Sequence, residues 1–205
     1  MKILVCISQA PDTTSRIAFT DGDKAFDSSG VQYIVNPYDE WYALVRAIEL
    51  KEQQGGTVTT ITIGEAACDP IIRKALAIGA DDAIRVNAAP EDSMQVAQLI
   101  AEHAQAGAFD AILCGKETID HNGSVVPAMV AELLDMPFVA LATSLEVENG
   151  IAKMTREVGG GEESVEVALP FVASASKGMA EQRIPNMRGI MSARSKPLNV
   201  VEASA

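Results

Sequence analysis

Residues 111–126 read Ala111-Ile-Leu-Cys-Gly-Lys-Glu-Thr-Ile-Asp-His-Asn-Gly-Ser-Val-Val126, and this stretch indicates the fold class. It begins with a short apolar run typical of a buried strand, continues through a polar loop with two glycines, and ends where an apolar helical pattern starts. Three earlier apolar runs are followed by helical patterns in the same order. This alternation predicts a mainly parallel sheet with helices on both faces.

The boundaries of these elements follow from turn and capping signals. The expected parallel strands are Ile3–Ile7, Val58–Ile63, Ala83–Val86 and Ala111–Cys114. The expected helix starts are Asn36 as N-cap with Pro37 at the first helical position, Asp69-Pro70, a position near Asp92, and Ser124 as N-cap. Glycines predict the ends of the first two helices, at Gly55-Gly56 and at Gly79.

The last third of the chain changes from helical to alternating patterns. Leu145–Glu148 and Ile151–Met154 flank Asn149-Gly150, which is a strong hairpin signal. Ser164–Leu169 predicts another antiparallel strand, and Phe171–Ala175 predicts a final buried one. We therefore expect a mixed sheet, with antiparallel strands added toward the C-terminus.

The composition argues against several classes of partner. The 205-residue chain carries 28 acidic and 16 basic side chains, for a formal net charge of -12. Nucleic acids and anionic membranes bind through Lys and Arg, so we expect neither as a partner. No stretch approaches the roughly 18 apolar residues of a membrane-spanning helix, and the opening run is too short for a signal peptide, so we expect no membrane insertion and a cytoplasmic location. The cysteines are too widely spaced for a metal or redox motif, which predicts reduced thiols and no metal.

Ligands of open parallel sheets bind beyond the carboxyl ends of the strands, where helix N-termini face a crevice. Three segments are expected to converge there: Cys6–Ser8, Asn36–Asp39 and Cys114–Ser124. In the last, Gly115 permits close backbone approach, and residues 122–124 offer N–H donors suited to a phosphate. Neither GxGxxG nor GxxxxGK[ST] is present. The pattern alone leaves two interpretations open, a nucleotide site or an ordinary glycine turn with a capped helix.

The sequence offers no recognisable catalyst. His121 lies in the loop after the fourth strand, but no Ser or Cys nucleophile stands in a recognisable elbow near it, so a loop contact is the preferred interpretation. The carboxylate pairs Asp81-Asp82 and Glu162-Glu163 are typical of solvated turns rather than of acid–base chemistry. We therefore expect neither hydrolysis nor group transfer, and no enzymatic activity of the chain itself.

Five segments, spread over nearly the whole chain, together resemble the β subunit of electron transfer flavoproteins. They are Lys2–Asp12, Asn36–Glu40, Ile72–Asp81, Leu113–Asp120, and Thr155–Glu163 followed by Leu169–Ser174. The resemblance implies a Rossmann-like three-layer sandwich of the adenine nucleotide α-hydrolase-like type over residues 1–176. It also implies that an α and a β subunit share one FAD, held mostly by α, while β buries a structural AMP.

The resemblance places the AMP contacts in the converging segments. The implied contacts are Cys6, Asn36, Pro37, Tyr38, Asp39, Ile63, Gly115, Lys116, Glu117, Thr118, Ile119, Asp120, His121, Asn122, Gly123, Ser124, Val125 and Val126. Backbone amides around residues 122–124 would take the phosphate, and apolar strand ends would hold the adenine. Residues 121–127 depart from the acidic or Thr-Gly patterns of most relatives, which shifts phosphate binding toward backbone groups and Ser124.

The tail and one strand carry the implied partner contacts. Residues 177–205 would form a recognition loop and a short C-terminal extension, in which Lys177–Met191 resembles the loop that inserts an apolar anchor into a partner dehydrogenase. By position this anchor is Met187. The residues alone favour the alternative that the methionines of the tail pack against the body. Glu157 resembles the carboxylate that pairs with α and biases the orientation of the flavin domain.

The function implied by the resemblance is electron relay. FAD between the subunits would accept electrons from dehydrogenases such as the acyl-CoA dehydrogenases of fatty acid oxidation and pass them to a quinone oxidoreductase. Two alternatives stay open. A bifurcating β subunit would bind a second FAD in place of AMP and use NADH, whereas a stand-alone sensor of similar fold would bind an adenine nucleotide without any α subunit.

Overall fold

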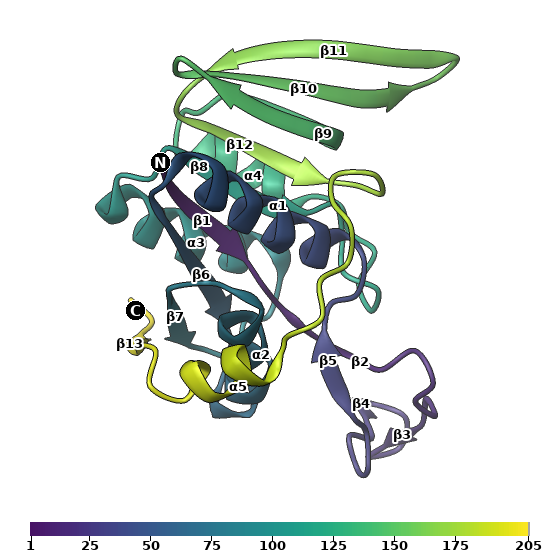
Figure 1. Cartoon of the computed structure of the whole chain (residues 1–205). Coiled ribbons are helices and arrows are strands. Elements are labelled where there is room, and N and C mark those ends of the chain that lie inside the picture. Colours follow the sequence, from purple (N-terminus) through teal and green to yellow (C-terminus); the bar gives the residue numbers. More distant parts are fainter. Residues whose placement is uncertain (205) are drawn as a thin grey trace.

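A nine-stranded sheet forms the middle layer of the molecule (Figure 1). The computed structural model describes residues 1–204, so Ala205, the last residue of the expected extension, lies outside the described residues. The strands lie in the order β11-β10-β9-β12-β8-β1-β6-β7-β13. Their bounds are β1 Lys2–Cys6, β6 Thr57–Ile63, β7 Asp82–Asn87, β8 Ala111–Gly115, β9 Phe138–Glu148, β10 Ile151–Val158, β11 Gly161–Ala168, β12 Phe171–Ala175 and β13 Leu198–Glu202.

The helices and two small ribbons complete the fold. The helices are α1 Asp39–Gln54, α2 Asp69–Ile78, α3 Ser93–Gly107, α4 Val126–Leu133 and α5 Met187–Ala193, with a 3-10 turn at Ala66–Cys68. The ribbons pair β2 Gln9–Pro11 with β5 Tyr33–Val35, and β3 Phe19–Thr20 with β4 Ala25–Phe26. Both ribbons project from one end of the sheet, at the lower right of Figure 1.

Side chains of the central strands alternate between two cores because successive residues of a strand point to opposite faces. Ile3 and Val5 of β1 belong to the core that also contains residues of α1 and α2. Leu4 and Cys6 belong to the core that contains residues of α3 and α4. A strand buried on both faces requires a continuous apolar run, and this is what the sequence contains. The prediction of a three-layer α/β sandwich is therefore confirmed.

The sheet is mixed, as predicted. Strands β12, β8, β1, β6, β7 and β13 are parallel to their neighbours, and β9 joins β12 in parallel before β10 and β11 continue antiparallel. Between β9 and β10, Asn149 and Gly150 have φ values of 50° and 79°. Two positive φ angles are required by the tight hairpin turn that Asn-Gly favours, so the predicted hairpin is also confirmed.

The sequence does not predict the strand at one edge of the sheet. β13 pairs in parallel with β7, from Leu198 opposite Ala83 to Glu202 opposite Asn87. Phe171–Ala175 is buried throughout, as predicted, but it is not the final strand. β13 is an edge strand with exposed side chains, and it therefore lacks the apolar run that marks the central strands.

The expected N-cap of the first helix is wrong. α1 begins at Asp39 after Tyr38, whose φ of 67° lies in the left-handed region, so Pro37 is not in the first turn either. Asn36 is fully buried and uses its side chain to bond a distant loop. An Asn side chain can hydrogen-bond either the backbone next to it, as a helix cap does, or the backbone of a distant segment. Asn36 bonds the distant segment.

Ser124 is likewise not a helix cap. α4 begins at Val126, with Val125 in the cap position and no side-chain cap bond. The Ser124 hydroxyl instead donates to the Glu117 carboxylate over 2.8 Å. The other two expected starts are confirmed, because α2 begins at Asp69 and the Asp92 side chain caps α3.

Replacing Phe171 with Ala should lower the free energy of unfolding by about 3–5 kcal/mol, because its buried ring would leave a cavity in a packed core. Urea denaturation followed by circular dichroism measures this change. Phe19→Ala is the matched control: Phe19 is 60% exposed, and its loss should cost less than about 1 kcal/mol. Equal losses for the two variants would contradict the placement of β12 in the core.

Candidate functional site

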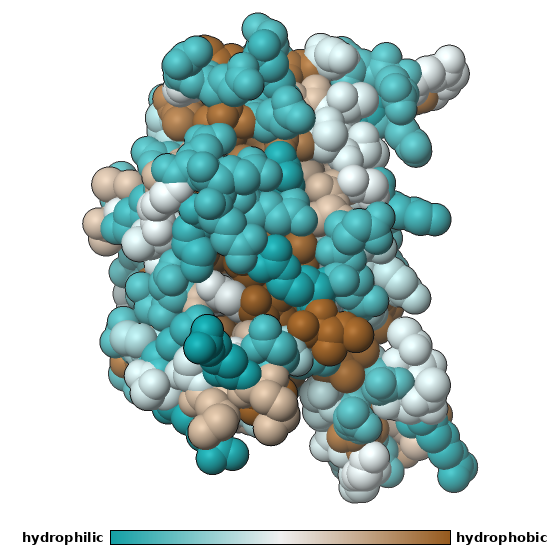
Figure 2. All heavy atoms as spheres, viewed as in Figure 1, coloured by the Kyte–Doolittle hydropathy of each residue, from teal (hydrophilic) through white to brown (hydrophobic). Residues whose placement is uncertain are grey.

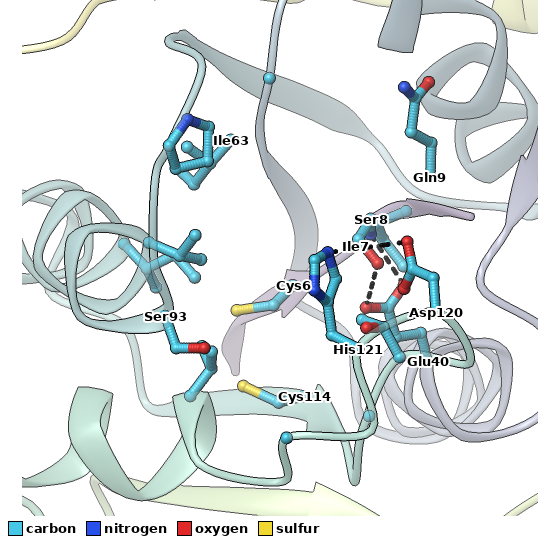
Figure 3. Close-up of a pocket in the computed structure, with 18 of the residues that line it drawn as sticks. Cys6, Ile7, Ser8, Gln9, Glu40, Ile63, Ser93, Cys114, Asp120 and His121 are labelled. Atoms are coloured by element: carbon cyan, nitrogen blue, oxygen red, sulfur yellow. Dashed lines mark hydrogen bonds and ion pairs between the residues drawn. The ribbon is translucent and has the colours of Figure 1, made fainter. Parts of the chain in front are cut away.

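A cavity of about 450 Å³ lies at the carboxyl ends of β1, β6, β7 and β8 (Figure 3). The order of the sheet turns at β1, since β6 and β7 follow on one side and β8 lies on the other. Crevices at such a switch point are where open α/β sheets bind ligands. The volume falls in the range of sites for small organic ligands.

The structure divides the implied contact residues into two groups. Those in the wall of the cavity are Cys6, Ile63, Gly115, Lys116, Glu117, Thr118, Asp120, His121, Gly123, Ser124, Val125 and Val126. Those outside the wall are Asn36, Pro37, Tyr38, Asp39, Ile119 and Asn122. The end of β1 and the loop after β8 are thus brought together around one space. The segment before α1 instead supports that loop through hydrogen bonds.

The buried side chain of Asn36 holds the loop after β8 in place. Its Nδ2 donates to the carbonyl oxygen of Glu117 over 2.9 Å, and its Oδ1 accepts from the backbone N–H of Ile119 over 3.0 Å. A side-chain amide offers one donor and one acceptor in one plane, so it can pair with a stretch of backbone much as a neighbouring strand does. Asn36 therefore fixes the conformation of the loop that forms one wall of the cavity.

Glu40 joins the start of α1 to the end of β1. Its carboxyl group accepts from the backbone N–H and the hydroxyl of Ser8, each over 2.7 Å, and its side chain lines the cavity beside Asp120 (Figure 3). Burial raises the pKa of Glu40 to about 8, against the opposing effect of the Ser8 hydrogen bonds. A Cβ at Gly115 would lie 2.7 Å from the Glu40 backbone nitrogen, so the close approach that Gly115 permits is to α1.

Carboxylates outnumber cations in the wall of the cavity. The acidic side chains there are Glu40, Glu65, Glu91, Asp92, Glu117 and Asp120, whereas the Lys or Arg side chain in this wall is Lys116. The Lys116 ammonium pairs with Glu117 at 3.0 Å, and this contact raises the pKa of Lys116. Hydrogen bonds from Ser124 and Lys116 lower the pKa of Glu117. Side chains therefore give a phosphate little net attraction at this site.

Backbone groups at the start of α4 supply what the side chains do not. Within residues 1–204, the N–H groups of residues 123–126 have no hydrogen-bond acceptor. Ser124 has a left-handed backbone with φ of 52°, and Val125 has a right-handed one with φ of -107°. When adjacent residues have left-handed and right-handed conformations, their N–H groups point into one shared concavity. The positive end of the α4 dipole lies at the same place. This cradle fits an anionic group such as a phosphate.

The floor of the cavity is apolar and uncharged. Cys6 of β1 and Cys114 of β8 lie on neighbouring strands, and both sulfur atoms point into the cavity in Figure 3. A hydrogen bond with the Cys114 thiol and burial raise the pKa of Cys6 well above its usual value. Ile61, Ile63 and Ile100 complete the floor. Such a surface suits a flat, weakly polar ring.

Sequence reasoning missed several residues of the wall. The loop after β7, residues 88–93, lines the cavity, as do Gln9, Glu40 and Ala67. The β7 loop follows a strand that the sequence does predict, so the rule about carboxyl ends would have found it. Glu40 carries no comparable signal, because an acidic residue in the first turn of a helix is common.

The two implied partner contacts lie apart from the cavity wall. Met187 opens α5 and is 73% exposed, and Glu157 is exposed near the end of β10. The packing alternative holds for Met179, which is buried in the core, but not for Met187 or for Met191, which is 68% exposed. Two methionines of the tail therefore face solvent in this chain.

Comparison with known proteins identifies the family. The electron transfer flavoprotein domain matches residues 23–205. The chain belongs to the electron transfer flavoprotein family. It is 35% identical over 206 residues to the electron transfer flavoprotein subunit beta of Bacillus subtilis, covering 98% of this chain and 79% of that protein. It is 40% identical over 211 residues to the subunit beta of Syntrophomonas wolfei, covering 100% of this chain and 81% of that protein. It is 31% identical over 208 residues to the subunit beta of Homo sapiens, covering 98% of this chain and 81% of that protein.

Membership of this electron transfer flavoprotein family makes the chain a component of an electron carrier. A β subunit of such a carrier implies an α-subunit partner and association with a flavin. Over residues 1–204, no helix combines the length and apolar character needed to cross a membrane. The same residues contain no group of three His, Cys, Asp or Glu side chains arranged to hold a metal ion.

Replacing Glu40 with Gln should change the free energy of unfolding more favourably at pH 8.5 than at pH 5. The unfolded chain loses the Glu40 proton near pH 4.5, whereas the folded chain keeps it up to about pH 8. The group therefore reduces stability progressively as pH rises between these values, and Gln does not titrate. At about 1.4 kcal/mol per pKa unit, the free energy of unfolding of the variant relative to the wild type should increase by roughly 2–5 kcal/mol from pH 5 to pH 8.5.

Chemical denaturation of the wild type and the variant across this pH range measures the difference. A stability difference for Glu40→Gln that is constant from pH 5 to pH 8.5 would show that Glu40 ionises normally in the folded protein.

Proposed function

We propose that this chain binds AMP in the cavity and acts with an α subunit as a cytoplasmic electron relay between dehydrogenases, such as acyl-CoA dehydrogenases, and a quinone oxidoreductase. The observation that carries the proposal is the cradle of N–H groups at residues 123–126, which opens on an apolar cavity at the switch point of the sheet. Membership of the electron transfer flavoprotein family supports the assignment.

In this proposal the phosphate of AMP lies against the N–H groups of residues 123–126. The adenine lies on the apolar floor around Cys6, Cys114 and Ile63. A monophosphate suits the acidic wall better than a diphosphate or triphosphate, because it brings less negative charge close to the carboxylates. Asn36 and its neighbours contribute by fixing the loop.

The chain's own part in the relay is positioning. FAD bound between the subunits supplies the redox chemistry. Met187 offers an exposed apolar anchor to a dehydrogenase, and Glu157 offers an exposed carboxylate to the α subunit. AMP serves to stiffen the loops at the carboxyl ends of the strands, so that the surface presented to α keeps one shape.

The chain purified together with its α subunit should contain about one AMP and one FAD per heterodimer, measured by mass spectrometry and absorbance of the released nucleotides. Two FAD and no AMP would instead identify a bifurcating carrier. AMP bound by a chain that has no affinity for the α subunit would identify a nucleotide sensor. A chain without nucleotide, and unaffected by added AMP, would contradict the proposal.

Ala67→Trp should reduce the AMP content at least about tenfold, because the indole would occupy part of the cavity that Ala67 lines. Ala66→Trp is the matched control, since the neighbouring Ala66 is also exposed but lies outside the cavity wall. Equal AMP content in the two variants would place the nucleotide elsewhere. Thermal unfolding of both variants checks that the fold is retained.

A further inference from the structure

The 3 cysteines of the chain all line the cavity at the carboxyl ends of the strands. Cys6 ends β1, Cys114 lies in β8, and Cys68 ends the 3-10 turn that follows β6. Each of them is buried as a free thiol. The outer surface, in contrast, is mostly hydrophilic in the view of Figure 2, with apolar residues in separate patches. The thiols of this chain are therefore gathered around one internal space.

The thiols of Cys6 and Cys114 form a pair. Val5 lies opposite Leu113 in the parallel strands β1 and β8, and the same register places Cys6 opposite Cys114. Both side chains face the core that contains residues of α3 and α4, and the two thiols are hydrogen-bonded. Neighbouring strands lie about 4.8 Å apart, a Cα separation that a bridge between two cysteines can span. One ligand atom can therefore contact both sulfur atoms.

Cys68 does not add a third sulfur ligand to this pair. A Cβ on Gly64 would lie 2.5 Å from the Cys68 sulfur, so this thiol is packed against the loop that follows β6. In the part of the chain that the structure describes, no three His, Cys, Asp or Glu side chains are arranged to hold a metal ion. The pair of Cys6 and Cys114 is therefore a site with two sulfur ligands.

Two neighbouring sulfur atoms favour a particular class of ligand. Calcium and magnesium ions require oxygen ligands, and zinc takes four protein ligands, or three and a water molecule. Thiol sulfur instead favours soft, thiophilic elements. Trivalent arsenic that already carries one organic group has two bonds left to form, and a pair of thiols supplies both. The ligand that matches this pair is therefore a trivalent arsenical with one organic substituent.

We propose that Cys6 and Cys114 form a dithiol site for a monosubstituted trivalent arsenical, and that this ligand and an adenine nucleotide exclude each other from the cavity. The second part rests on the proposed function, which places the adenine on the same two residues. In the binding step the As=O bond of an organic arsenoxide breaks and two As–S bonds form. Both thiol protons leave with the oxygen as one water molecule. Arsenic stays trivalent, so the step needs no oxidant or reductant.

The surroundings of the pair favour this ligand over a disulfide. Disulfide exchange begins with a thiolate, whereas the hydrogen bond with the Cys114 thiol and burial raise the pKa of Cys6 and keep it protonated. Condensation with an arsenoxide consumes protonated thiols. Ile61, Ile63 and Ile100 offer an apolar surface to an aryl group on the arsenic, and the cavity of about 450 Å³ has room for it. The site therefore suits an aryl arsenical.

The test titrates the αβ heterodimer, freed of AMP, with phenylarsine oxide and reads the intact mass of this chain. The wild type should gain the mass of one phenylarsenic group per chain. Cys6→Ala and Cys114→Ala should each bind the probe at least about 100-fold more weakly, because the second As–S bond can no longer form within one site. Cys68→Ala is the matched control and should bind the probe as the wild type does. An excess of a small dithiol should release the arsenical from the wild type.

A wild type without the adduct, an undiminished affinity in Cys6→Ala or Cys114→Ala, or loss of the adduct in folded Cys68→Ala would overturn the dithiol site. Circular dichroism checks the fold of each variant, and Cys6→Ser and Cys114→Ser repeat the test with oxygen in place of sulfur.

The exclusion of AMP is tested separately. Saturating AMP should weaken arsenical binding to the wild type at least about tenfold, because the two ligands compete for one cavity. Arsenical binding that AMP does not weaken would overturn the mutual exclusion. A wild type that binds the arsenical but has no affinity for AMP would contradict the proposed function and leave the dithiol site intact.

Discussion

The candidate site depends on how closely the loop after β8 approaches the start of α1. Gly115 leaves no room for a side chain against the Glu40 backbone, Asn36 bonds the loop at Glu117 and Ile119, and Glu40 bonds Ser8 at the end of β1. These contacts bring strand ends that are far apart in the sequence around one cavity. A carboxyl group is buried in this arrangement, and the cost of that burial is reduced when the group keeps its proton. The buried Glu40 carboxyl group therefore lowers the stability of the fold at the place where it helps to form the cavity.

The sequence predicts the parallel core because central strands must be apolar on both faces, as Ile3–Ile7 and Ala111–Cys114 are. It predicts the β9–β10 hairpin because Asn149-Gly150 satisfies a demand for two positive φ angles that few residue pairs meet. It does not predict β13, since an edge strand with one solvated side needs no regular apolar pattern. The role of Asn36 could not be predicted either, because its partners lie more than 80 residues away and the local Asn-Pro pattern is the same as that of a helix cap.

The distribution of charge explains how an acidic chain can present sites of opposite character. At the cavity, carboxylates surround a cradle of backbone N–H groups, so the attraction for an anion is short-ranged and depends on orientation. On the face formed by α2 and α5, Lys74, Arg188 and Arg194 form no ion pair within residues 1–204, whereas Arg183 pairs with Glu52. The field of the unpaired cations extends over about a Debye length. The first arrangement suits a small ligand held in one pose.

The edge position of β13 also bears on the entropy of association. The segment that carries α5 leaves the sheet at β12 and returns at β13, and β8, β1, β6 and β7 lie between these two strands. With strands spaced about 4.8 Å apart, the segment spans roughly 24 Å across the sheet and is anchored at both ends. A polypeptide tethered in this way has little conformational freedom left to lose when a partner binds, so more of the contact energy is retained as affinity.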